Sequence, residues 1–389
     1  MTNGTSSNVT GRIASIDVLR GIIMVLMAVD HVRVYAGVPA RGPDPAVFFT
    51  RWITNFCAPG FVFFAGVGIY LHGRRMNDAR ALSRYLVTRG LFLVFLELTV
   101  VRFSWTFNMD YKNFMMAGVI WMIGWCMVLM ALLVRLPIKW IVAIGVVMII
   151  GHNVMDFFSQ SLGPIAFSSS LSWLWNALYF GGPILIGGAP LVVLYVIVPW
   201  IGLMCAGYAF GTVMQMSRDR RQTVCLRLGL AAMAGFVVLR AAAVYGDPFS
   251  WKVQAGWLMF LNPAKYPPSL QFLLMTCGPL IFALPFVETV KGGKWGVLTT
   301  IGRVPLFFYL LHLPLIHLLA IGVHLVRFGS VSSWLLSNQP MVPPPAPEHI
   351  WNLPLLYLVW IIAVFLLFWP CRWMARLKER YPGAWSSYI

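Results

Sequence analysis

Apolar residues gather in ten long runs along the chain, separated by stretches that hold most of the charged residues. A helix needs roughly 20 mainly apolar residues to cross the hydrocarbon core of a bilayer, and most runs approach that length. The runs cover residues 18–37, 52–72, 89–104, 114–134, 139–157, 190–214, 226–246, 268–290, 304–325 and 353–370. This pattern predicts an all-α fold, a polytopic transmembrane helical bundle of about ten spans.

The composition agrees with a membrane protein. Hydrophobic residues make up 59% of the 389 residues and charged residues only 11%, whereas soluble domains carry roughly 25% charged residues. The mean hydropathy is +0.78. Residues 1–11 are polar and uncharged, without the basic and apolar parts of a signal peptide, so we expect a flexible tail there. We expect residues 12–389 to form a single transmembrane domain.

The basic residues indicate the orientation of the chain. The net charge is +17, and Lys and Arg fall mostly in alternate connections, such as 74–89, 218–227 and 372–380. Because cytoplasmic loops are enriched in Lys and Arg, this distribution predicts cytoplasmic N- and C-termini. In a chain surrounded by a lipid bilayer, the charge does not indicate nucleic-acid binding. The short polar amino terminus and the lack of a large soluble domain favour a bacterial inner (plasma) membrane.

The six cysteines are scattered and form no C-x-x-C motif, which predicts packing residues rather than disulfides or a zinc site. We expect no metal. The sequence also lacks a P-loop, a serine nucleophile elbow, an H-E-x-x-H motif and a dinucleotide fingerprint. An enzyme built on this chain must therefore use acid–base chemistry by His and Asp.

The first span contains the densest group of ionisable residues. Arg20 begins its apolar run, and Asp30 and His31 follow deep inside it. His31 lies eleven residues after Arg20, about 16 Å along a helix. Ionisable groups at such depth are costly and indicate a functional site. The alternative is a basic helix start followed by a buried structural Asp–His pair.

Three further spans carry histidines or acids. His152 and Asp156 are four residues apart and would share a helix face, where the carboxylate can orient the imidazole as a general base. The alternative is a structural pair at a helix end. His312 lies deep in its span and is either catalytic or structural. For Glu97 we expect a basic partner, and Arg102 and Arg240 both qualify.

The long connections 160–190, 246–268 and 328–352 are rich in aromatic residues and proline. Interfacial anchoring explains most aromatic residues of this kind in membrane proteins. The remainder could line an outward-facing acceptor site, because flat rings stack well on sugar faces.

Two motifs resemble a superfamily of membrane acyltransferases. The run Ser15-Ile-Asp-Val-Leu-Arg-Gly21 is similar to the first helix of the heparan-α-glucosaminide N-acetyltransferase family and its bacterial relatives, and so is the span start Pro59–Gly66. The similarity continues more loosely to about Arg227 and again in Gly302–His312. One departure is that the loop 37–51 lacks the histidine of the lysosomal enzyme. His31 instead matches the essential histidine of the related acyltransferase-3 group.

The resemblance implies transfer of acetyl from cytosolic acetyl-CoA to an amino sugar on the far side of the membrane. We expect the CoA phosphates to be held by Arg20, with Asp17 and Arg303 in the same site. We expect His31 to act as general base on the acceptor, oriented by Asp30 or another carboxylate. The acceptor is a small molecule or glycan, and the resemblance leaves a homodimer open.

Two other functional classes remain. A proton-coupled transporter would use Asp30, His31, Glu97 and His152 as a proton relay and would move a solute without any thioester. A scaffold would show neither solute flux nor tight CoA binding and would tolerate the change His31→Ala. The resemblance favours the enzyme.

Overall fold

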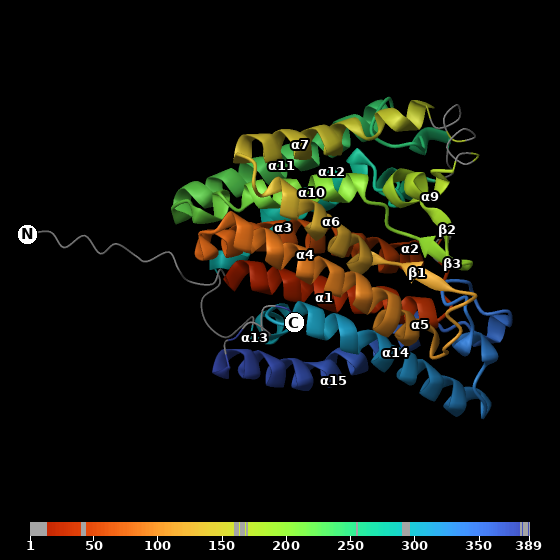
Figure 1. Cartoon of the computed structure of the whole chain (residues 1–389). Helices are drawn as coiled ribbons and strands as arrows, with labels where there is room; N and C mark the ends of the chain where they lie inside the picture. The colour runs from red at the N-terminus through yellow and green to blue at the C-terminus, as the bar shows by residue number, and fades with distance from the viewer. Residues whose placement is uncertain are drawn as a thin grey trace, which may run out of the picture.

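The computed structural model of the chain describes residues 14–39, 44–158, 163, 168, 170–253, 256–289, 296–381, 383 and 388. Its long helices run side by side, and a small sheet lies at one end of the bundle (Figure 1). The α-helices are α1 (Ala14–Tyr35), α2 (Pro45–Trp52), α3 (Cys57–Met76), α4 (Ala79–Leu96), α5 (Arg102–Thr106), α6 (Val119–Leu133), α7 (Ile138–Gly151), α9 (Ser172–Trp175), α10 (Val198–Phe210), α11 (Arg218–Ala242), α12 (Leu270–Thr289), α13 (Gly296–Gly302), α14 (Pro305–Phe328) and α15 (Leu353–Arg380).

Each predicted span overlaps one of these helices. Five described segments have the length and hydropathy of a membrane-crossing helix: Pro45–Met76, Arg218–Ala242, Leu270–Glu288, Pro305–Phe328 and Leu353–Arg380. The chain is therefore a helical membrane protein. Helix α1 begins and α15 ends at the same end of the bundle, opposite the sheet (Figure 1). Ten crossings and cytoplasmic termini stay predictions.

The expectation of an all-α chain misses a three-stranded sheet. Strand β3 (Ala189–Val193) lies between β1 (Met115–Ala117), which is parallel to it, and β2 (Gly182–Ile186), which is antiparallel. Two predicted spans therefore begin as strands, because short apolar strands continue directly into apolar helical runs and hydropathy cannot separate them. Gly187 and Gly188 have φ of 58° and 86°, as a tight hairpin turn requires.

Helix α1 lies inside the bundle and contacts α3, α12, α13, α14 and α15. Its contact with α13 is made backbone to backbone through two glycines. A Cβ added to Gly21 would lie 2.0 Å from the carbonyl oxygen of Leu298, and one added to Gly302 would lie 1.7 Å from that of Asp17. Small residues allow such close approach between membrane helices. The two glycines therefore hold the first turns of α1 against α13.

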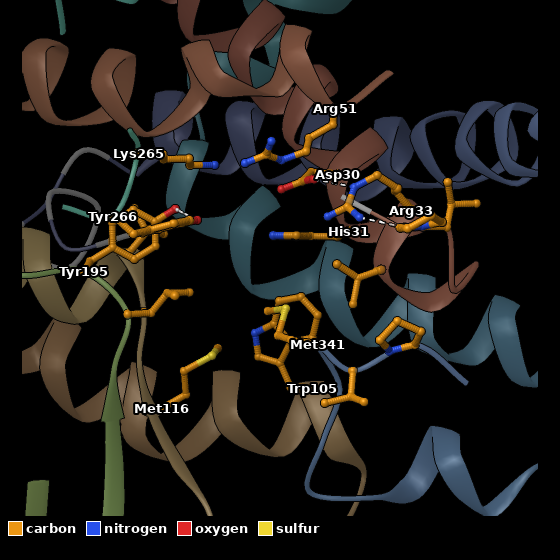
Figure 2. Close-up of a pocket in the computed structure, with 18 of the residues that line it drawn as sticks. Asp30, His31, Arg33, Arg51, Trp105, Met116, Tyr195, Lys265, Tyr266 and Met341 are labelled. Atoms are coloured by element: carbon orange, nitrogen blue, oxygen red, sulfur yellow. Dashed lines mark hydrogen bonds and ion pairs between the residues drawn. The ribbon is translucent and has the colours of Figure 1, made fainter. Parts of the chain in front are cut away.

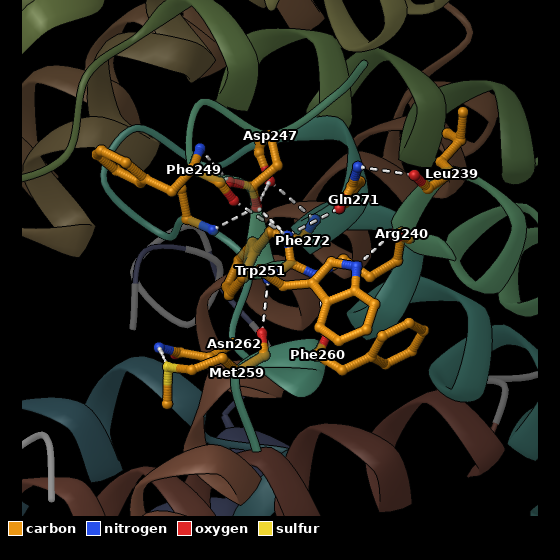
Figure 3. A network of polar contacts seen from close by, with 12 residues as sticks. Leu239, Arg240, Asp247, Phe249, Trp251, Met259, Phe260, Asn262, Gln271 and Phe272 are labelled. Carbon is orange, nitrogen blue, oxygen red and sulfur yellow. Dashed lines mark hydrogen bonds and ion pairs between the residues drawn. The ribbon is translucent and has the colours of Figure 1, made fainter. Parts of the chain in front are cut away.

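A buried polar network fixes the connection between α11 and α12. Arg240 of α11 forms an ion pair with Asp247 at 3.2 Å, and the two side chains are 1% and 2% exposed. The guanidinium also donates to the carbonyls of Phe260 and Met259 and to Gln271 (Figure 3). Burial raises the pKa of the Asp247 carboxyl above its usual range. The network anchors the residues that lead to Lys265.

We expect Gly302→Ala to destabilise the protein, because its methyl group would overlap the backbone of α1. Overpacking of this kind costs about 1–3 kcal/mol. The melting temperature of purified protein in detergent measures the effect. Gly322→Ala is the matched control, since no atom lies within 4 Å of a Cβ there. Equal melting temperatures of the two variants would contradict the importance of the close contact.

Candidate active site

A cavity of about 290 Å³ lies at the carboxyl end of α1. Its walls come from α1, α2, α5 and β1, from the connection after β3, and from residues 265–266 and 341–343. Figure 2 shows Asp30, His31, Arg51 and Lys265 around a common space. The cavity thus combines segments that are far apart in the sequence.

His31 is paired with His312 of α14. His31 Nδ1 lies 2.5 Å from His312 Nε2, and the two rings meet edge to edge, with an interplanar angle of 24° and centroids 4.8 Å apart. Trp105 closes the other side, edge to face, at 5.0 Å. His312 is fully buried, whereas His31 lines the cavity. The structure therefore brings together two of the predicted catalytic histidines.

The hydrogen bonds of His312 assign the tautomers of the pair. His312 Nδ1 lies 2.6 Å from the carbonyl oxygen of Tyr309, and a carbonyl can only accept. Nδ1 must therefore carry the proton, so Nε2 of neutral His312 accepts a hydrogen bond from His31 Nδ1. Neutral His31 is left with an unprotonated Nε2. That nitrogen is the one a general base requires.

Asp30 does not provide the expected orientation of His31. Its carboxylate accepts a hydrogen bond from Arg33 Nε at 2.9 Å, and Arg33 also donates to the carbonyl of Val38. Asp30 lines the same cavity, so it contributes to the charge there. The group bonded to His31 Nδ1 is therefore the imidazole of His312 and not a carboxylate.

Two cations and two tyrosines complete the rim. Arg51 donates to Asn262 at 3.4 Å, while the Lys265 ammonium lies 5.3 Å from the centre of the Tyr266 ring. The hydroxyls of Tyr195 and Tyr266 are 3.2 Å apart. The aromatic-rich connection 246–268 was the sequence signal for Tyr266. The other three residues carry no signal that separates them from ordinary loop residues.

The prediction of a basic partner for Glu97 was wrong. Its carboxylate accepts hydrogen bonds from the backbone N–H groups of Ile120 and Trp121, at 3.0 and 3.2 Å, in the first turn of α6. Arg102 and Arg240 bond to other groups. Free N–H groups at a helix amino terminus satisfy a carboxylate without any basic side chain.

His152 and Asp156 lie outside this cavity. His152 ends α7, where Nδ1 lies 2.9 Å from the carbonyl oxygen of Met148 and Nε2 lies 2.9 Å from that of Pro268. Asp156 accepts hydrogen bonds from Asn153 and Tyr179. Both residues therefore have structural partners, and neither lines the His31 cavity.

The predicted CoA-binding residues lie toward the opposite end of α1. Asp17 is buried in the first turn, and Arg20 Nη2 donates to the carbonyl of Phe64 at 2.6 Å. Arg303, which follows α13, pairs with Glu379 of α15. Because α13 touches the backbone of α1 at Asp17, these predicted residues share one region.

Metal ligands are not grouped in the described part of the chain, where no three His, Cys, Asp or Glu side chains could hold an ion together. All six cysteines are free and buried, as expected for packing residues.

The comparison with protein families gives one result. The model of the heparan-alpha-glucosaminide N-acetyltransferase catalytic domain matches residues 12–244, which include α1 with His31. No curated protein matches the chain. The match favours an acyltransferase over a transporter. Since it covers more than half of the chain, this protein belongs to the heparan-α-glucosaminide N-acetyltransferase family, a family of membrane acetyltransferases.

Proposed function

We propose that the protein transfers the acetyl group of acetyl-CoA to an amino sugar or another acceptor bound in the His31 cavity. The observation that carries the proposal is the hydrogen bond between His31 Nδ1 and His312 Nε2, from which we infer that Nε2 of neutral His31 is unprotonated. A thioester is already activated, so proton removal and positioning are sufficient chemistry for the transfer.

In this mechanism His31 Nε2 takes a proton from the amine or hydroxyl of the acceptor as that group bonds to the acetyl carbonyl carbon. The carbon–sulfur bond breaks, and the proton passes on to the CoA thiolate. During the step His31 is an imidazolium, and His312 Nε2 stabilises it by accepting its Nδ1–H. His312 is a positioning residue here. His152 and Asp156 have no part in the step, because neither lines the cavity.

We further propose that the CoA phosphates bind near Arg20, Asp17 and Arg303, with the protein in a bacterial plasma membrane and both termini in the cytoplasm. The cavity then faces the outer side, because it lies at the opposite end of α1 from these residues. About 16 Å separates Arg20 from His31 along the helix, so the donor would extend through the bundle. A homodimer stays open.

Acetyl-CoA should raise the melting temperature of the wild-type protein in detergent. A ligand at a hundredfold excess over its dissociation constant stabilises the folded state by about 2.7 kcal/mol. We expect Arg20→Ala to weaken this stabilisation, because it removes a positive charge from the proposed phosphate site. A folded wild-type protein that gains no stability at high acetyl-CoA would contradict donor binding.

His31→Ala should lower acetyl turnover by roughly 100- to 10,000-fold, as expected for the loss of a general base. Acetyl-CoA should still stabilise the variant. His312→Phe should lower kcat with little change in either KM, because a ring remains but the acceptor nitrogen is lost. The control is His152→Gln, a histidine outside the cavity. Turnover by His31→Ala at the wild-type rate would exclude His31 as the base.

A further inference from the structure

Glu97 lies at an irregular point of the fold. It begins η2 (Glu97–Val101), a π-helical turn that separates α4 from α5. Such turns are rare and are found frequently at functional sites. The Glu97 side chain is 1% exposed and borders the cavity together with Gly118 and Tyr309. A carboxylate at this place faces the same ligand space as His31.

The bonds of Glu97 leave part of its accepting capacity unused. Oε2 accepts the N–H groups of Ile120 and Trp121 at 3.0 and 3.2 Å. A carboxylate offers about four lone-pair sites. Among the described residues, no Lys or Arg forms an ion pair with Glu97. Capacity for at least one further hydrogen bond therefore remains.

The other carboxylate in the cavity wall already has a basic partner. Asp30 is paired with Arg33 at 2.9 Å. Arg51 and Lys265 line the same cavity and are hydrogen-bond donors themselves. Among the described residues, Glu97 is therefore the carboxylate of the cavity wall that has no basic partner, and a hydroxyl or ammonium group of a ligand can donate to it.

We propose that Glu97 determines acceptor specificity, by accepting a hydrogen bond from a hydroxyl or ammonium group of the acyl acceptor. This inference rests on the proposed transferase function. A site built to bond a polar group of its substrate rejects analogues without that group, because a buried partner would be left unsatisfied. Glu97 would thereby hold the acceptor in the cavity that contains His31.

The discriminating variant is Glu97→Gln. The N–H groups of Ile120 and Trp121 require an acceptor, so the glutamine oxygen should face them and keep α6 capped. The amide NH2 then replaces the second carboxylate oxygen and presents a donor where the ligand needs an acceptor. A merely structural Glu97 would tolerate this change, because its contact with α6 survives.

With glucosamine as the acceptor probe, we expect KM for the acceptor to rise roughly 10- to 100-fold in Glu97→Gln. That is the size expected for the loss of one hydrogen bond to a charged group. KM for acetyl-CoA and the melting temperature should stay near the wild-type values. Glu288→Gln is the matched control, since Glu288 pairs with Arg221 and does not line the cavity.

An acceptor KM within twofold of wild type in folded Glu97→Gln would overturn the inference. If Glu97→Gln does not fold, Glu97→Asp replaces it, because aspartate keeps the carboxylate but withdraws it by one methylene. A rise in the acceptor KM alone would then support the role of Glu97. An unchanged acceptor KM would overturn it. Wild-type turnover with a normal acceptor KM in the variant rejects only the role of Glu97. Wild type without acetyl transfer or acetyl-CoA stabilisation rejects the proposed function together with it.

Discussion

The structure depends on the enclosure of α1, a helix that carries Asp17, Arg20, Asp30, His31 and Arg33 through the middle of a membrane protein. Lipid offers no partner to such groups, so each must be satisfied by the protein. Helices α3 and α12–α15 surround α1, and glycines let α13 approach its backbone. Backbone carbonyls receive Arg20 and Arg33, while Asp30 and Arg33 satisfy each other. The packing around α1 therefore also supplies the hydrogen-bond and ion-pair partners that its polar side chains need.

The same enclosure produces the site. Because α14 lies against α1, His312 meets His31, and the carbonyl of Tyr309 fixes the tautomer of His312. A backbone carbonyl of α14 therefore sets, through His312, which nitrogen of His31 carries the proton. Trp105 of α5 limits the freedom of the His31 ring from another direction. Three helices thereby define the position and the protonation of one nitrogen.

Much of the fold could be predicted from hydropathy, since every expected span overlaps a described helix. The cost of buried charge likewise led to His31 and Asp30 without any structure. The pairing of His31 with His312 could not be predicted, because 281 residues separate them and no local pattern links them. The prediction of a basic partner for Glu97 failed for a different reason. Its donors are backbone N–H groups of α6, and backbone groups leave no signature in a sequence.

The region of the family match and the residues that line the cavity do not coincide. The match ends at residue 244 and includes His31, Glu97 and Tyr195, whereas His312 and Lys265 lie beyond it. Helices α12–α15, which enclose α1, also lie entirely outside the matched region. A chain ending at residue 244 would lack four of the helices that pack against α1 and would leave His31 without His312. The carboxyl-terminal helices therefore complete both the enclosure of α1 and the walls of the cavity, although the family match ends before them.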